Sequence, residues 1–187
     1  MSDPYLYPGT DVLRNKENIT DAEELAAFER LATANRMENL TTDLPVTPEG
    51  YRAIHRYIFQ DVYDWAGEYR VVDIARTDDL FCLVPHIARE LAKRFEAIRS
   101  EDELRGLSAE DFAARAAEHI TELNAIHPFR EGNGRSLRAF LSLLAHRAGQ
   151  EMHMDRIDAA SWIDASRVGF RTGDSQAMRD IIAAAIR

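Results

Sequence analysis

Apolar residues at helical spacing run through most of this sequence, and this periodicity constrains the fold more than any other feature. Five stretches repeat apolar side chains every three or four residues, the spacing that gathers them on one face of an α-helix. These faces are Leu25, Phe28, Leu31, Ala32 and Asn35; Tyr51, Ile54, Ile58 and Val62; Ile87, Leu91, Phe95 and Ile98; Phe112, Ala116, Ile120 and Leu123; and Leu137, Phe140, Leu141 and Leu144. Two further helices are expected over residues 158–168 and from Ser175 to the end.

Helix start and stop signals bound these stretches. Thr20 with Glu23 forms a capping box, Thr47-Pro48 and Pro85 open helices, and Ser108 caps the next one. That helix must stop near Ile126, because a residue that precedes proline is pushed out of the α region and Pro128 follows His127. Gly149 ends the helix that begins near Asn133.

One segment, residues 71–84, breaks the helical pattern. The β-prone runs Val71-Val72 and Leu80–Val84 flank a turn at Thr77-Asp78-Asp79, which predicts a small hairpin. The fold class is therefore all-α, a helical bundle with a short β-hairpin flap near residues 74–84. We expect a single domain over residues 1–187, with an N-terminal extension (1–20), a core (about 21–170) and a C-terminal helix (171–187).

Composition excludes several classes of protein. A chain of 187 residues suits one domain, and its net charge of −9 argues against nonspecific nucleic-acid binding, which needs a basic surface. Cys82 is the only cysteine, so neither an intrachain disulfide nor a thiolate metal site can form. With no secretory signal and no apolar run near 18 residues, we expect a cytoplasmic protein that neither spans a membrane nor binds nucleic acid directly.

The segment His127–Arg138 joins two of the predicted helices and carries the chemistry. Gly132 and Gly134 let the backbone approach a ligand closely, and a helix that begins near Asn133 points unpaired N–H groups outward. Such a helix end attracts anions, phosphate above all.

The charged residues of this segment sharpen that expectation. Arg135 and Arg138 lie in the first helical turn, where a cation costs roughly 0.3–1 kcal/mol, which indicates that a polyphosphate binds there. Glu131 offers an oxygen ligand that could hold Mg²⁺ together with phosphate oxygens. His127 is the natural general base, because an unperturbed imidazole titrates near neutral pH.

Simpler interpretations exist for each residue alone. A His-Pro pair between helices is often a turn, and Gly132-Asn133-Gly134 alone is equally well explained as a tight turn. Their combination within twelve residues favours a functional site. No P-loop motif occurs, and Leu137 stands where a dinucleotide-binding motif needs its third glycine. The histidines at positions 55, 86, 119, 146 and 153 lack metal-ligand spacing and are expected at the surface or in packing.

The same twelve residues match the Fic family signature, His-x-Phe-x-(Asp/Glu)-Gly-Asn-Gly-Arg-x-x-Arg, at every defined position. The segment Phe59–Arg70 resembles the one that precedes the flap in Fic proteins, and Tyr7–Lys16 resembles the N-terminal extension of compact bacterial Fic toxins. The resemblance therefore covers most of the chain.

This resemblance implies a protein adenylyltransferase that uses ATP and Mg²⁺. His127 would deprotonate a target hydroxyl, and Glu131 would hold Mg²⁺. An anion hole would come from Gly132, Asn133 and Gly134, with Arg135 at the β-phosphate as a further catalytic residue and Arg138 at the γ-phosphate. Phe129 would anchor this nucleotide-binding loop in the core. The flap would dock an extended target segment through Ile74, Arg76, Leu80 and Phe81.

The resemblance also concerns partners and control. Fic proteins are commonly inhibited by a helix that carries Ser or Thr four residues before Glu-Gly or Glu-Asn, and Thr33–Asn39 misses this pattern by one position. The chain thus resembles toxins that a separate small helical antitoxin inhibits, and such toxins often modify DNA gyrase or topoisomerase IV. Transfer of phosphate, UMP or phosphocholine, or nucleotide sensing without turnover, stays open as an alternative.

Overall fold

The computed structural model describes residues 3–41, 43–76 and 79–186. This part of the chain forms seven α-helices and one two-stranded sheet, which confirms the all-α class. The helices are α1 (Ala22–Glu38), α2 (Pro48–Phe59), α3 (Ile87–Ser100), α4 (Ala109–Ile126), α5 (Asn133–Arg147), α6 (Ala159–Thr172) and α7 (Gln176–Ala185). Short 3₁₀ turns lie at Val84–His86, Asp102–Leu104 and Met154–Arg156.

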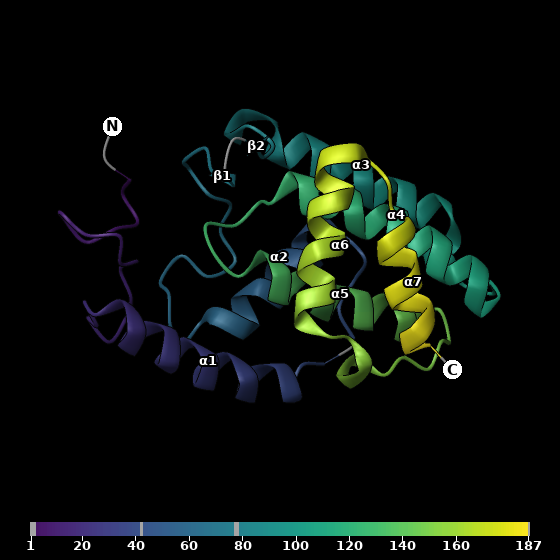
Figure 1. Cartoon of the computed structure of the whole chain (residues 1–187), viewed down its shortest axis with the longest axis horizontal. Coiled ribbons are helices and arrows are strands. Elements are labelled where there is room, and N and C mark those ends of the chain that lie inside the picture. Colours follow the sequence, from purple (N-terminus) through teal and green to yellow (C-terminus); the bar gives the residue numbers. More distant parts are fainter. Residues whose placement is uncertain (1–2, 42, 77–78, 187) are drawn as a thin grey trace.

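Helices α4 and α5 form the centre of the molecule. Helix α4 packs against α3, α5, α6 and α7, and α5 also packs against α2. Their inward faces are fully buried, as the apolar spacing of residues 112–123 and 137–144 predicted. Helices α6 and α7 lie side by side over α4 in Figure 1. The stretch between α4 and α5, residues 127–132, is therefore held at both ends by helices whose inward faces are buried.

Helix α1 lies along one edge of the molecule and packs on α2 (Figure 1). Two expectations about it were wrong. Its N-cap is Asp21, whose carboxylate accepts hydrogen bonds from the N–H groups of Glu23 and Glu24, so Thr20 is one residue too early. Leu31 is 75% exposed and Asn35 is exposed too, because an edge helix buries only a narrow strip. The buried side chains of α1 are Leu25 and Thr33.

Helix α2 begins as predicted, with the Thr47 side chain accepting from the N–H of Gly50 and Pro48 in the first turn. It ends at Phe59, so Val62 is buried beyond the helix and not on its stripe. The N–H of Val62 bonds to the carbonyl of Phe59, and that of Tyr63 bonds there as well, at 2.9 and 3.0 Å. This turn leads the chain towards the flap.

The flap is a smaller hairpin than the sequence predicted. Its strands are β1 (Ala75–Arg76) and β2 (Asp79–Leu80), which pair antiparallel, while the turn residues 77–78 lie outside the described part. The expected strand residue Val71 has no strand partner and is 66% exposed. Beyond β2 the N–H of Phe81 bonds to Ile74 O at 3.2 Å, and that of Cys82 bonds to Ala125 O of α4. The flap is thus hydrogen-bonded to the end of α4.

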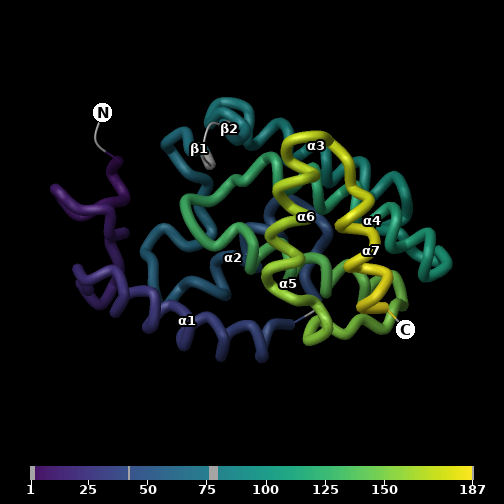
Figure 2. Tube along the Cα trace, in the orientation of Figure 1, coloured from purple at the N-terminus to yellow at the C-terminus, as the bar shows by residue number. Residues whose placement is uncertain are grey.

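The first and last described residues lie on opposite sides of the molecule (Figure 2). Residues 3–20 form a segment of turns with an antiparallel bridge between Leu6 and Leu13. The described chain ends beyond α7, where Ile186 forms an isolated β-bridge with Met152, so the helix predicted from Ser175 stops at Ala185. Within the residues that the structure places, no helix combines the length and the apolar character needed to cross a bilayer.

Candidate functional site

The site begins where α4 ends. Pro128 prevents the helix from continuing, and His127 takes up the left-handed conformation (φ 48°) with its N–H bonded to Leu123 O at 3.2 Å. The imidazole Nδ1 lies 3.0 Å from the carbonyl oxygen of Asn124. Because a carbonyl oxygen only accepts, Nδ1 carries the proton and Nε2 carries the lone pair. This tautomer suits His127 for a general base acting through Nε2.

Phe81 of the flap supports this imidazole. Its ring stacks on the His127 ring with 3.9 Å between centroids, and its other neighbour is Phe170 of α6. Phe81 is only 7% exposed. The target-docking role expected for Phe81 stays a prediction, and in the structure its ring lies against the base.

Arg70 links the backbone at His127 to the flap through hydrogen bonds. Its side chain is fully buried, and its guanidinium donates to the carbonyls of His127 (2.8 Å), Val72 (2.9 Å), Cys82 and Ile126. Burial lowers the pKa of Arg70, while nearby Asp73 opposes that shift. Carbonyl groups at a helix C-terminus lack partners within the helix, so this cation caps α4. The sequence offers no signal for this role beyond an arginine just before the flap.

The turn from His127 to α5 is shaped by side chains of its own. Gly132 has φ 80°, and a Cβ at this position would lie 2.2 Å from Cζ of Phe59, so only glycine fits. The amide of Asn133 accepts from the N–H of Phe129 at 3.0 Å and donates to its carbonyl at 2.8 Å. The Asn133 side chain therefore closes the turn, and only its backbone is left to face an anion.

Phe129 lies below this turn in the core with no exposed surface. Its ring stacks on the imidazole of His55 at 3.9 Å and packs near Tyr51. It anchors the turn, as expected, and does not line the cavity that the turn borders.

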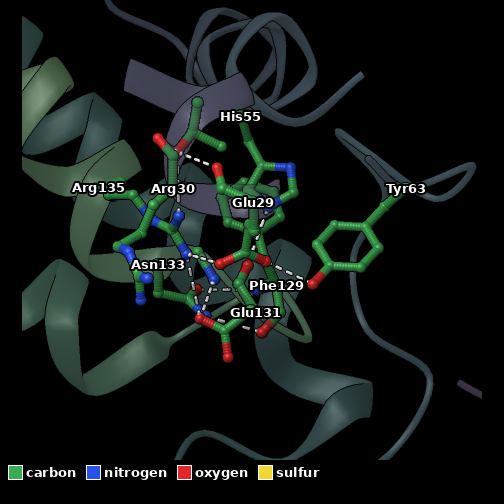
Figure 3. Close-up of polar contacts among 10 residues, drawn as sticks. Glu29, Arg30, His55, Tyr63, Phe129, Glu131, Asn133 and Arg135 are labelled. Carbon is green, nitrogen blue, oxygen red and sulfur yellow. Dashed lines mark hydrogen bonds and ion pairs between the residues drawn. The ribbon is translucent and has the colours of Figure 1, made fainter. Parts of the chain in front are cut away.

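His55 is hydrogen-bonded to the turn at Glu131 (Figure 3). Its Nδ1 accepts from the N–H of Gly67 at 2.8 Å, so Nε2 carries the proton and donates to the carbonyl of Glu131 at 3.0 Å. Burial lowers the pKa of His55 to about 3, which keeps the ring neutral. The sequence predicted a packing residue and could not indicate its hydrogen bonds, because both partners are distant along the chain.

The start of α5 is suited to binding an anion. Its N-cap, Gly132, provides no side-chain hydrogen bond, so the first N–H groups of the helix have no capping partner among the described residues. A Cβ on Gly134 would meet no atom within 4 Å, which means that the backbone there borders open space. Arg138 is half-buried, and its Nε has no hydrogen-bond partner among the residues described. Burial and the nearby charge of Arg135 both lower the pKa of Arg138.

Glu131 stands beside the two arginines with a side chain that is 45% exposed. Its Oε1 accepts from the N–H of Gly132 at 2.8 Å and lies 3.6 Å from Nη2 of Arg135. The described residues contain no cluster of three histidines, cysteines or carboxylates suited to a metal. One carboxylate fits Mg²⁺, which takes few protein ligands and completes its shell with phosphate oxygens and water.

These elements border one cavity of about 650 Å³. Nine of the predicted site residues line it: Ile74, Phe81, His127, Glu131, Gly132, Asn133, Gly134, Arg135 and Arg138. Leu80 is 53% exposed on the flap, and for Arg76 the structure describes the backbone alone. The opposite wall comes from α6, where Ala159, Trp162 and Ile163 were not predicted. An amphipathic helix gives no indication of which cavity its apolar edge faces.

Comparisons with known proteins place the chain beside one family. A sequence model of the Fic/DOC family matches residues 45–145. The chain is 42% identical over 166 residues to a probable protein adenylyltransferase, y4lH, of Sinorhizobium fredii, covering 88% of the chain and 86% of that relative. It is 37% identical to the probable protein adenylyltransferase Fic of Escherichia coli, covering 96% and 90%.

A solved structure shows the same fold. The BepC effector protein of Bartonella tribocorum, crystallised with bound AMPPNP, superimposes with a TM-score of 0.89 at 27% sequence identity. The alignment covers 98% of this chain and 96% of that one. The same fold is therefore found in a protein that was crystallised with an ATP analogue.

Proposed function

The chain belongs to the Fic/DOC family, and from this premise we propose that it is a protein adenylyltransferase, which transfers AMP from ATP to a hydroxyl side chain of another protein. One observation carries the proposal: the base His127 and the start of α5 face the same cavity, and Arg138 there has an Nε without a partner among the described residues. A base and a polyphosphate site side by side are what nucleotidyl transfer to a hydroxyl requires.

His127 starts the reaction. Its Nε2 accepts the proton of a target Tyr, Thr or Ser hydroxyl while the hydroxyl oxygen bonds to the α-phosphorus of ATP. The bond from the α-phosphorus to the oxygen that bridges the α- and β-phosphates breaks, and pyrophosphate leaves. The hydrogen bond from Nδ1 to Asn124 O stabilises the imidazolium that forms. General-base catalysis of this kind contributes ~10²–10⁴-fold.

The start of α5 binds the phosphates. The backbone N–H groups around Gly134 donate to phosphate oxygens, Arg135 contacts the β-phosphate, and Arg138 contacts the γ-phosphate. The unpartnered Nε of Arg138 supports the last assignment, because a half-buried guanidinium N–H without an acceptor costs about 1–3 kcal/mol that a phosphate oxygen would recover. Donors fixed before the reaction stabilise the charge that develops on the leaving pyrophosphate.

Glu131 would hold Mg²⁺ at the edge of this site. Held there, Mg²⁺ would supply positive charge that offsets part of the negative charge of the phosphates. The hydrogen bond from the N–H of Gly132 keeps the Glu131 carboxylate beside the start of α5.

The remaining parts of the site would contact the nucleoside and the target protein. Trp162 and Ile163 of α6 with Ile74 of the flap form an apolar wall suited to an adenine ring. Leu80 of β2 is exposed and does not line this cavity, and an extended target segment would add alongside the flap there. The target is a protein with an accessible hydroxyl, and DNA gyrase and topoisomerase IV are the first to test in a cytoplasmic setting.

A separate inhibitor fits a second cavity. A hollow of about 240 Å³ lies between the end of α1 and α5, with Met37, Leu40, Leu143 and Met154 on its walls and Arg138 at one side. A short helical antitoxin bound there would point a glutamate at Arg138 and occupy the γ-phosphate site. In the near match Thr33–Asn39, Glu38 is exposed and has no ion pair within the described chain, which favours a partner over self-inhibition.

Mass spectrometry of the modified target tests this proposal. The protein is incubated with Mg²⁺, a lysate and an equimolar mixture of ATP, UTP and CDP-choline, and modified peptides are sequenced. We expect AMP on Tyr, Thr or Ser. Phosphate, UMP or phosphocholine as the main modification would reassign the transferred group, and no modification at all would favour a nucleotide-sensing module.

A further inference from the structure

Arg135 is held by residues outside the signature segment. Its Nη2 lies 2.5 Å from Oε1 of Glu29, and its Nη1 donates to the hydroxyl of Thr33 at 3.1 Å. Both partners belong to α1, one turn apart. The guanidinium also covers the ring of Phe59, with 4.6 Å from Cζ to the ring centroid. These three contacts fix the position and the plane of the guanidinium.

Glu29 is itself held in place. Figure 3 shows its carboxylate between the guanidinium of Arg135 and the hydroxyl of Tyr63, which donates to Oε2 of Glu29. The Glu29 side chain is 13% exposed and Tyr63 is buried, so water competes little for these bonds. Burial and the charge of Glu29 raise the pKa of Tyr63, so this hydroxyl keeps its proton and stays a donor. Both oxygens of Glu29 are thus engaged.

The contacts leave Arg135 able to bind a further anion. A guanidinium has five N–H donors, and Glu29 and Thr33 use one each at hydrogen-bond distance. Arg135 also lines the large cavity beside Gly134 and Arg138. An arginine side chain free to move would lose considerable rotamer entropy on binding a phosphate, and an arginine already fixed would not.

We propose that Glu29 and Tyr63 are positioning residues, which hold Arg135 so that its remaining donors meet the β-phosphate of the nucleotide. This rests on the proposed function, in which Arg135 binds that phosphate. Helix α1 is then part of the nucleotide site, although it lies outside the His127–Arg138 segment and outside the family match at residues 45–145.

Considered by charge alone, Glu29 would weaken phosphate binding, because it offsets the positive charge of Arg135. The structure favours positioning for two reasons. The Thr33 and Phe59 contacts act on the same guanidinium without adding negative charge. Arg138, one turn further along α5, supplies a cation that no described residue pairs with.

Calorimetric titration of three nucleotides tests the proposal. Mg²⁺ with ADP, ATP or AMP is titrated into wild type, Glu29→Gln and Tyr63→Phe, with Glu24→Gln on the exposed face of α1 as the matched control. We expect Glu29→Gln to weaken ADP and ATP roughly tenfold, the order of one charge-assisted hydrogen bond. Tyr63→Phe should weaken them less, and AMP affinity should not change. Glu24→Gln should behave as wild type.

Several results would overturn the proposal. Tighter ADP binding or faster transfer in Glu29→Gln would make Glu29 a competitor of the phosphate. Equal losses for ADP and AMP would show a general structural role, and unchanged ADP affinity in both variants would show no role. Glu29→Asp, which keeps the charge, provides a second variant should Glu29→Gln fail to fold, and we expect it to retain more ADP affinity than Glu29→Ala.

A double variant separates this proposal from the proposed function. Adding Glu29→Gln to Arg135→Ala should not weaken ADP further if Glu29 acts through Arg135, whereas an additional tenfold loss would overturn the positioning role. Failure of the wild-type protein to transfer AMP would instead overturn the proposed function and leave these ADP affinities interpretable.

Discussion

At the scale of single residues, the two functionally decisive groups differ in how many partners the fold gives them. His127 has a fixed tautomer and a stacked ring, whereas the Nε of Arg138 lacks any partner in the described chain. A base must be oriented before the reaction, while a phosphate ligand must keep donors available. The contrast agrees with opposite tasks for two residues of one segment.

Arg138→Ala provides a test of its phosphate contact. The variant should weaken ATP binding by about ten- to a hundredfold, the value of a charged hydrogen bond, and leave ADP binding nearly unchanged. Calorimetry with both nucleotides measures this. Equal losses for ATP and ADP would contradict the γ-phosphate assignment. Arg147→Ala, at the other end of α5, serves as the control.

His55 makes stability depend on pH. The unfolded chain protonates this histidine below about pH 6.5, and the folded chain does so only near its lowered pKa of about 3. Stability is therefore unaffected above pH 6.5 and falls as the pH is lowered from there towards 3, with a slope that approaches about 1.4 kcal/mol per unit.

Denaturant unfolding at several pH values checks this dependence. His55→Gln should have lower stability at neutral pH and a smaller loss between pH 6.5 and 4. His146→Gln, which alters an exposed histidine of α5, should follow the wild type. Parallel curves for wild type and His55→Gln would contradict the account.

At the scale of elements, the flap and the end of α4 act as one unit through Arg70. Its guanidinium reaches carbonyls of both, and a lysine cannot span them because its ammonium is a single point of contact. We expect Arg70→Lys to lose several kcal/mol of unfolding free energy, since buried carbonyls left unpaired cost about 1–3 kcal/mol each.

The same variant should separate transfer from nucleotide binding. The α5 start is not bonded to Arg70, so ATP affinity should fall little in the folded fraction while transfer falls strongly. Arg56→Lys, whose side chain is 60% exposed and paired with Glu68, should change neither quantity. Equal losses of unfolding free energy in Arg70→Lys and Arg56→Lys would contradict the role of Arg70 in joining the flap to the end of α4.

The elements also show how much of the fold and of the site could be predicted from the sequence. Apolar spacing predicted the long helices, because an α-helix in a small domain must bury one face. The predicted site residues account for half of the residues that line the cavity. Leu31 and the cap at Asp21 were missed because local patterns do not show that α1 lies at an edge. The roles of Glu29, His55 and Arg70 depend on contacts between distant segments, which spacing along the chain does not encode.

At the scale of the whole molecule, the question is whether a partner or the chain itself controls activity. Glu38 ends α1 exposed, while the cavity beside Arg138 has room for a partner's side chain. Glu38→Gly should therefore change transfer by the isolated protein less than twofold, and expression without an inhibitor should arrest growth only when His127 is intact. An increase of orders of magnitude in Glu38→Gly would show that the chain inhibits itself.

The central claim is AMP transfer with His127 as the base, and the fate of labelled ATP tests it most directly. ATP with label on either the α- or the γ-phosphate is incubated with Mg²⁺, lysate and either wild type or His127→Ala. We predict that protein-bound label comes from α alone with wild type, and that His127→Ala binds ATP normally but transfers ~10²–10⁴-fold less. Label from γ alone, or transfer by His127→Ala within a few-fold of wild type, would contradict the account.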